Sequence, residues 1–140
     1  KQPGPHGKVV IDDYAHHPNE IQASISSVRD LYPGRKIAVI FQPHLYSRTR
    51  DLAPQFASAL SLADELLLLP IYPAREQPIP GTSSQLILNQ ANCPIKNIYS
   101  KENLIKSIHL RNFDVLLTLG AGDVVNLLPA ICEQIKLQHS

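Results

Sequence analysis

The sequence predicts one α/β domain, residues 1–140, built on a doubly wound, mostly parallel sheet with helices on both faces. Two observations carry the prediction. Short aliphatic runs are nearly continuous instead of alternating with polar residues, which is typical of strands covered on both faces. Segments with apolar residues at helical spacing lie between these runs and are joined to them by short links. A length of 140 residues suits one such domain, which needs no disulfide or metal to fold.

Five runs are predicted as strands, of which the fourth along the chain is the weakest because it is the least apolar. They are Lys8–Tyr14, Lys36–Phe41, Glu65–Leu69, Ile95–Tyr99 and Asp114–Leu119.

Four helices are predicted between and after these strands. The first begins near Pro18, a residue that suits a first helical turn, and ends at Pro33-Gly34. The remaining helices are indicated by Leu52, Phe56, Ala59 and Ala63, by the segment Asn103–His109, and by Val124, Leu128, Ile131 and Ile135. Pro70–Gly81 holds four of the twelve prolines and is predicted to be an ordered loop.

Composition excludes several classes of protein. A net charge of +1 without a basic run argues against nucleic acid as a partner. No apolar stretch approaches the roughly 18 residues of a membrane span, so no membrane partner is expected. Cys93 and Cys132 share no metal-binding or redox spacing, so both are interpreted as reduced, which suits a cytoplasmic protein. The chain begins at Lys1 and contains no Met, so we expect it to be a piece of a longer protein.

Polar and cationic residues follow the strands, and in such sheets ligands bind at the carboxyl ends of the strands. We therefore predict a functional edge, with Asp13, Tyr14, His16, His44 and Arg48 lying together. The runs in question are Asp12–Pro18, Gln42–Arg50, Pro70–Glu76 and Gly120–Asp123.

Each of these features also has a purely structural interpretation. Asp12 and Asp13 could cap a turn or helix. The adjacent side chains of His16 and His17 diverge, which disfavours a shared metal, and no metal site is predicted. Arg48 and Arg50 could be solvated charges at a helix start, but cations there oppose the helix dipole and are better explained by a bound anion.

Familiar catalytic motifs are absent from the sequence. There is no G-x-x-x-x-G-K-[ST] phosphate loop and no G-x-S-x-G nucleophile elbow. Gly120-Ala121-Gly122 lacks the third glycine of the dinucleotide fingerprint, since position 125 is Val, so a tight turn with close backbone approach is predicted there. Receiver domains place an Asp and a Lys after strands where this chain has Pro70 and Gly120, so that class is set aside.

Four runs together resemble the third domain of the Mur ligase family, and within it the branch that adds L-alanine to UDP-N-acetylmuramate. They are DDYAHHP, FQPHLYSRTRD, LADELLLLPIYPAREQPIPG and TLGAGD, and the resemblance extends from about Gly7 to Leu128. The first run is similar across the family, whereas its combination with PHLYSRT is narrower. The resemblance implies a Rossmann-like carboxyl-terminal, amino-acid-binding domain of a three-domain enzyme.

The resemblance also implies a reaction and a set of roles. ATP, with Mg²⁺, phosphorylates the substrate carboxylate to an acyl phosphate, which the alanine amine attacks. ATP and Mg²⁺ would be bound mainly by a central domain, and UDP-N-acetylmuramate by an amino-terminal domain. Neither of these two domains is in this sequence. The alanine side of the site would comprise Tyr14, His16, His44, Tyr46 and Arg48, with Arg48 pairing with the alanine carboxylate and Asp13 on the nucleotide side.

One departure from the family pattern matters. Leu45 stands where many relatives are expected to carry Arg, so the anion contact depends more on Arg48, with Arg50 as a weaker candidate. Two alternatives stay open: the third domain of the tripeptide-recycling ligase or another Mur-type ligase, and a stand-alone, non-catalytic α/β binding module. Without a phosphate loop, the isolated domain is expected to fold but to be inactive.

Overall fold

The structure is a computed structural model and describes residues 2–3 and 8–137. The predicted domain of residues 1–140, and the resemblance that starts near residue 7, therefore include a few positions outside the described residues. The strands are β1 (Gln2–Pro3), β2 (Val9–Asp13), β3 (Ile37–Phe41), β4 (Glu65–Leu68), β5 (Ile95–Ile98) and β6 (Val115–Leu119).

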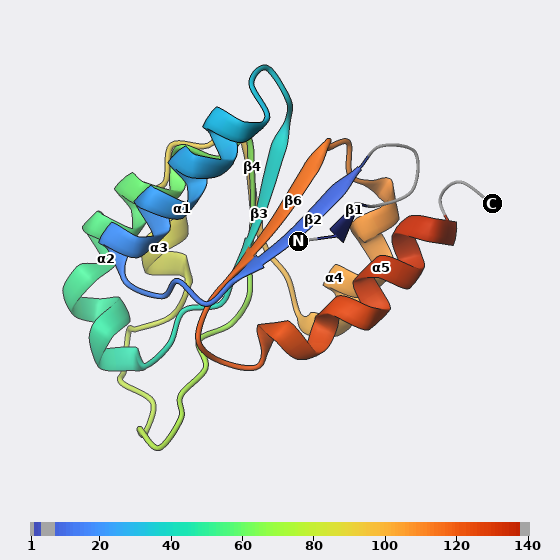
Figure 1. Cartoon of the computed structure of the whole chain (residues 1–140). Coiled ribbons are helices and arrows are strands. Elements are labelled where there is room, and N and C mark those ends of the chain that lie inside the picture. Colours follow the sequence, from blue (N-terminus) through green and yellow to red (C-terminus); the bar gives the residue numbers. More distant parts are fainter. Residues whose placement is uncertain (1, 4–7, 138–140) are drawn as a thin grey trace.

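The strands form one sheet in the order β1-β2-β6-β3-β4-β5 (Figure 1). Every neighbouring pair from β2 to β5 is parallel, and only β1 runs antiparallel, against β2. The last strand in the chain, β6, thus lies between β2 and β3, the first two of the parallel strands. All residues of β3, β4 and β6 are buried, as their continuous apolar runs predict, whereas the edge strand β5 is largely exposed.

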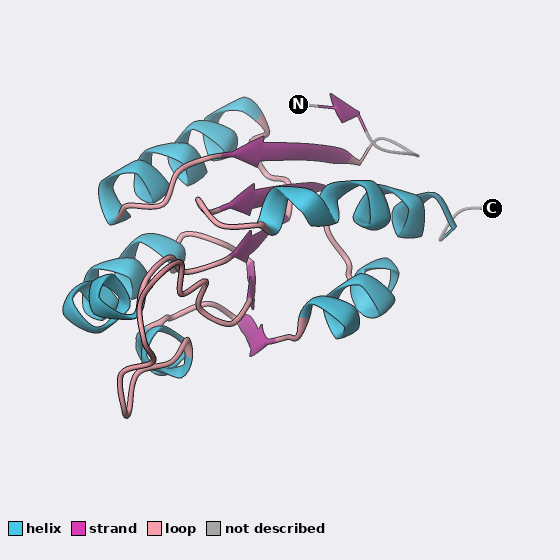
Figure 2. Cartoon of the chain, turned by 90° about the horizontal axis from the view of Figure 1, so that it is seen from below, coloured by secondary structure: helices cyan, strands magenta, loops and turns pink. Residues whose placement is uncertain are grey.

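Helices cover both faces of this sheet, so the predicted doubly wound fold is confirmed (Figures 1 and 2). One apolar core packs beneath α1, α2 and α3 and includes Ile25, Phe56 and Ile87. The other packs beneath α4 and α5 and includes Leu104 and Ile131. The helices are α1 (Pro18–Leu31), α2 (Tyr46–Leu60), α3 (Gln85–Gln90), α4 (Lys101–Ser107) and α5 (Leu128–Leu137), with the 3-10 helices η2 (Ile108–Leu110) and η3 (Val124–Leu127).

The predicted helices are all present, with shifted boundaries. Pro18 occupies the first turn of α1, as expected, and Gly34 follows the helix with a φ of 75°. The α2 helix ends at Leu60, so Ala63, which the apolar spacing predicts as its last buried position, lies in the buried turn after the helix. The last predicted helix is divided, with a 3-10 turn before α5.

Two elements were not predicted. The strand β1 has only two residues, and α3 has six, of which Ile87 alone is buried. Neither is long enough to show a periodicity. The segment of residues 70–81 is a loop, as predicted, and projects beyond the carboxyl edge of the sheet (Figure 1).

Candidate functional site

The predicted edge exists because three strands end together. Asp13 pairs with Leu119 on β6, and Leu119 pairs with Phe41 on β3, so the residues that follow β2, β6 and β3 are neighbours. Tyr14 and His16 lie in the connection after β2. His44 follows β3, while Tyr46 and Arg48 form part of the first turn of α2. The predicted placement of Asp13, Tyr14, His16, His44 and Arg48 at one edge is therefore confirmed, whereas their roles in binding stay predictions.

A row of four rings links the connections after three strands. The ring centroids of Tyr14 and His16 are 5.3 Å apart, and those of His16 and His44 are 6.4 Å apart, both edge to face. The ring of His44 stacks on Tyr72, from the loop after β4, at 5.7 Å and 18°. Tyr14, at the outer end of the row, is 69% exposed. This row places His16 beside His44 and leaves Tyr14 exposed at its end.

Arg48 presents an unsatisfied cationic group. Its Nη1 is buried and has no hydrogen-bond partner among the described residues, and the same is true of Nδ1 of His44. A buried polar N–H without a partner is costly, and a guanidinium in the first turn of a helix also opposes the helix dipole. Both costs are removed when an anion binds there. Arg50 differs, because its Nε lies 2.8 Å from the Asp51 carboxylate and the pair is exposed.

His44 is suited to remain neutral beside Arg48. Burial lowers the pKa of His44 from its usual value near 6.5, and the positive charge of Arg48, followed by that of His16, lowers it further. A neutral imidazole can accept a proton or donate a hydrogen bond without adding to the positive charge of the edge. The site therefore combines one fixed cation with one neutral imidazole.

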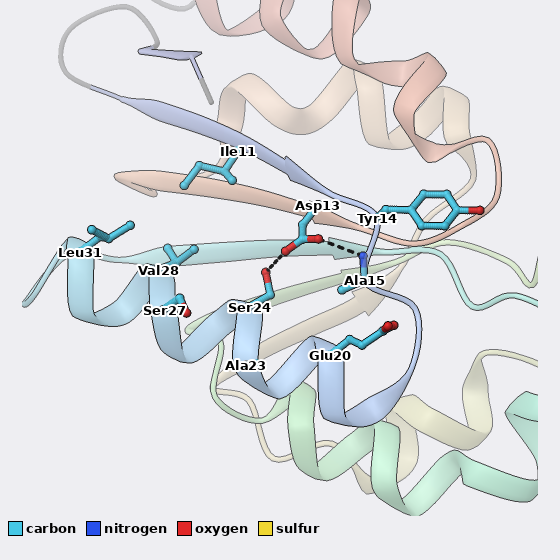
Figure 3. A pocket seen from close by; sticks show the side chains of 10 residues that line it. All are labelled: Ile11, Asp13, Tyr14, Ala15, Glu20, Ala23, Ser24, Ser27, Val28 and Leu31. Carbon is cyan, nitrogen blue, oxygen red and sulfur yellow. Dashed lines mark hydrogen bonds between the residues drawn. The ribbon is translucent and has the colours of Figure 1, made fainter.

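Asp13 has a structural role that the sequence left open. Its Oδ1 accepts a hydrogen bond from the Ala15 backbone N–H at 3.1 Å, and its Oδ2 accepts one from the Ser24 hydroxyl at 2.6 Å (Figure 3). The carboxylate thus ties the turn after β2 to α1. It also faces an open groove of about 520 Å³ between β2 and α1, which leaves one side of it accessible to a ligand. Asp12 is used differently, as the acceptor for the buried Thr118 hydroxyl at 2.6 Å.

Tyr46 does not join the ring row. It lines a separate pocket with Pro70, Ile71 and Ile98, on the side of the edge nearer to β5. Among the six residues predicted for the site, it is the one that the structure does not bring together with the others.

Sequence reasoning missed a polar network beside the site. The Gln42 amide donates to Asp123 at 2.7 Å and accepts from the Val124 N–H at 3.1 Å, and Lys101 pairs with the other Asp123 oxygen. A Cβ at Gly122 would lie 2.4 Å from Gln42 Oε1, so the close backbone approach predicted for this glycine turn is confirmed. The glycines were the available signal, but which side chain they approach is a tertiary property.

Within residues 2–3 and 8–137, no group of three His, Cys, Asp or Glu side chains is placed to hold a metal ion. No helix in the described part of the chain is long and apolar enough to cross a membrane. Cys93 and Cys132 are free and pack against the cores on opposite faces of the sheet. Because the sheet lies between them, they cannot form a disulfide within one chain. Burial raises the pKa of the Cys93 thiol to about 11, so it is a poor nucleophile.

Fold and site together define a class: an open α/β domain whose polar, aromatic and cationic residues gather at the carboxyl edge of its sheet. Comparison with known proteins makes this specific. The sequence matches the family described as "Mur ligase, glutamate ligase domain" over residues 2–122, and the chain belongs to this family.

Named relatives are close. The chain is 52% identical over 132 residues to the UDP-N-acetylmuramate–L-alanine ligase of Parabacteroides distasonis, covering 91% of this chain and 29% of that protein. It is 54% identical over 129 residues to the enzyme of the same name from Porphyromonas gingivalis, covering 91% of this chain and 28% of that protein. The chain therefore spans under a third of the length of these relatives.

Solved structures agree on the fold. The crystal structure of UDP-N-acetylmuramate-alanine ligase from Thermotoga maritima matches with a TM-score of 0.70 and 25% identity, over 97% of this chain and 29% of that one. A murein peptide ligase from Psychrobacter arcticus matches with a TM-score of 0.71 and 18% identity, over 90% of this chain and 27% of that one. The second likeness shows the fold alone.

Proposed function

We propose that this chain is the carboxyl-terminal, amino-acid-binding domain of an ATP-dependent ligase that joins L-alanine to UDP-N-acetylmuramate in peptidoglycan biosynthesis. Relatives about 50% identical carry that name over nine-tenths of the chain. The single observation that carries the proposal is Arg48, whose guanidinium has a buried Nη1 without a hydrogen-bond partner among the described residues and lies in the first turn of a helix at the carboxyl edge. An amino-acid carboxylate is the ligand that such a group fits.

In this proposal Arg48 forms a charge-assisted pair with the alanine carboxylate. Tyr14 and His16 border the space for the amino acid, and His44 lies behind them beside Arg48. The amine attacks an acyl phosphate and needs mainly to be positioned and to lose a proton. A neutral His44 and a ring row held from three connections suit this limited task. Tyr46 would act from its own pocket, by shaping the start of α2.

The nucleotide and its Mg²⁺ would be held mainly by a central domain of the full-length enzyme. The described residues fit only a minor contribution to nucleotide binding, because the sequence has no phosphate loop. Two carboxylates, Asp13 and Glu20, line the groove beside β2, and Asp13 is the one that directly follows the strand. Asp13 would accept a hydrogen bond from a ribose hydroxyl while keeping its bonds to Ala15 and Ser24. We accordingly propose that the 140-residue domain is inactive alone and that the full-length enzyme is cytoplasmic.

The experiment is a ligation assay on the full-length protein with UDP-N-acetylmuramate, ATP and Mg²⁺, offering either L-alanine or the tripeptide L-alanyl-γ-D-glutamyl-meso-diaminopimelate. We expect phosphate release and amide formation with L-alanine and neither with the tripeptide. The 140-residue chain, assayed in parallel, should release no phosphate above the blank. Use of the tripeptide in place of alanine would favour a recycling ligase, and no ligation of either would favour a binding module.

A further inference from the structure

The α2 helix, which carries Arg48, begins without a cap of its own. Its N-cap residue is Leu45, whose side chain has no acceptor for the free N–H groups of the first turn. Leu45 also has a φ of 76°, a positive value that is unfavourable for a residue with a Cβ. A helix start of this kind needs support from elsewhere.

The backbone of the loop after β4 supplies the first part of that support. The Leu45 N–H donates to the Tyr72 carbonyl at 2.9 Å, and the Tyr72 N–H donates to the Pro43 carbonyl at 2.8 Å. These two bonds form a short parallel bridge between His44 and Tyr72. They hold Leu45 in its unfavourable conformation and place the Tyr72 ring on His44.

A carboxylate from the same loop supplies the missing cap. Glu76 accepts a hydrogen bond from the Ser47 backbone N–H at 3.1 Å and another from the Ser47 hydroxyl. The Ser47 hydroxyl bond, and then its backbone bond, lower the pKa of Glu76, so the side chain is charged near neutral pH. The negative charge stands at the positive end of the α2 dipole, one residue from Arg48.

The loop bends sharply to bring Glu76 there. Ala74 has a φ of 54°, and the Glu76 N–H donates to the Pro73 carbonyl at 2.9 Å. Among the described residues, Leu45 and Ala74 are the two non-glycine residues with positive φ, and both belong to this junction. Backbone strain of this kind persists where the surrounding structure imposes it, commonly beside functional sites.

We infer that Glu76 is a positioning residue for amino-acid binding: through Ser47 it fixes the first turn of α2 and so directs the Arg48 guanidinium toward the amino-acid carboxylate. The inference rests on the proposed function and extends it to a residue that does not touch the substrate. The loop of residues 70–81 thereby becomes part of the alanine site, although it lies 22 or more residues from Arg48 in the sequence.

The test compares Glu76→Ala, Glu76→Gln and Ser47→Ala in the full-length ligase, with Glu133→Gln as a matched control. Glu133 is exposed on α5, on the opposite face of the sheet. We expect Glu76→Ala to raise the KM for L-alanine roughly five- to tenfold, because a misdirected cation binds its partner poorly. The KM values for ATP and UDP-N-acetylmuramate should stay within about twofold of wild type. Glu76→Gln, which keeps an acceptor oxygen for Ser47, should recover part of the loss.

A double variant tests whether Glu76 acts through Arg48. If it does, Arg48→Ala with Glu76→Ala should use alanine no worse than Arg48→Ala alone, since effects on one interaction are not additive. Additive losses would overturn the inference. So would an equal rise in all three KM values accompanied by lower thermal stability, which indicates a merely structural role.

The outcomes also separate the inference from the proposed function. If Arg48→Ala weakens alanine use and Glu76→Ala and Ser47→Ala do not, the inference alone fails. If Arg48→Ala leaves alanine use unchanged, the proposed role of Arg48 fails and the inference falls with it, whereas the ligase function itself is decided by the ligation assay with L-alanine and the tripeptide. If Glu76→Ala does not fold, Glu76→Gln and Ser47→Ala decide the same question. Glu76→Gln keeps the Ser47 hydroxyl, and Ser47→Ala keeps the Glu76 carboxylate.

Discussion

The two strand-to-helix junctions that build the site are stabilised in different ways. The junction between β2 and α1 is held by its own neighbours: Asp13 accepts from Ala15 and Ser24, and Glu20 accepts from the N–H groups of His16 and His17. The junction between β3 and α2 is held from far away in the sequence. Its backbone partner is Tyr72, and its helix cap is Glu76, 29 residues beyond Ser47.

This difference separates two ways of making a binding residue rigid. At the first junction, local bonds make the turn nearly independent of the rest of the domain. At the second, the position of Arg48 depends on whether the loop of residues 70–81 is in place. A change in that loop is therefore expected to weaken alanine binding. A change in the hydrogen bonds of the first junction should instead lower mainly the free energy of unfolding.

The largest effect is expected at Arg48 itself. Arg48→Ala in the full-length enzyme should lower kcat/KM for L-alanine at least roughly tenfold, since a charge-assisted pair to a carboxylate is worth about 1.5–3 kcal/mol. The KM for UDP-N-acetylmuramate should move much less. Steady-state kinetics with each substrate varied in turn measures both.

Two further variants sharpen the result for Arg48. Arg48→Lys should recover only part of the loss, because Lys offers a point charge in place of a bidentate fork. Arg50→Ala should be milder, because Arg50 is already paired with Asp51 at the surface. Alanine kinetics within about twofold of wild type for Arg48→Ala would instead identify a solvated residue of the helix start.

A matched pair of serines tests the comparison directly, because each donates its hydroxyl to the carboxylate of its own junction. Ser24→Ala should lower the free energy of unfolding by about 1 kcal/mol, the usual value of such a bond, and leave the alanine KM within about twofold. Ser47→Ala should raise the alanine KM by roughly threefold through the shifted Arg48. Denaturant unfolding of the 140-residue chain and kinetics of the full-length enzyme provide the two readings; the reverse pattern would contradict the distinction between the junctions.

Backbone strain in the loop gives a smaller effect. Ala74→Gly should stabilise the chain by roughly 0.5–1 kcal/mol, because glycine relieves the left-handed φ and the exposed Ala74 side chain loses no packing. Gly34→Ala is the converse control. Its φ is +75° with open space around the missing Cβ, so a loss of similar size is expected from strain alone. Chemical denaturation measures both, and a neutral Ala74→Gly would argue that Ala74 is not strained.

The smallest effect concerns pH. Burial lowers the pKa of His44 in the folded chain, so the unfolded chain binds a proton more readily below pH about 6.5. Stability should therefore be unaffected by His44 above that pH and should decline as the pH falls from about 6.5 toward the lower pKa of the folded state. The free energy of unfolding should differ less between pH 7.5 and pH 5.5 for His44→Asn than for wild type. An unchanged difference would show that His44 does not cause the pH dependence of stability.

Local chemistry explains which parts of the architecture the sequence predicted. Ile37–Phe41 is apolar throughout, and Val115–Leu119 is apolar except for Thr118, because both faces of each strand are buried. That property can be read from the sequence one residue at a time. Helix α1 carries its buried stripe and its Pro18 start in its own sequence. The residues after β2 and β3 were placed at one edge because parallel strands end on the same side.

The insertion of β6 between β2 and β3 follows from no local pattern, since the central strands are equally apolar and which pair is adjacent depends on how the helices pack. Arg48, whose buried Nη1 has no partner among the described residues, and Arg50, which is paired with Asp51, look alike in the sequence and differ only in what surrounds them. The role of Glu76 could not be predicted from the sequence. A capping residue that lies 29 residues from the helix start leaves no pattern in the sequence of that helix. The sequence by itself thus determined the elements and the edge at which ligands bind, because burial and strand direction are properties of single segments. Tertiary structure alone decided which cation is left unpaired and which loop directs it, because those depend on contacts between segments that the sequence keeps apart.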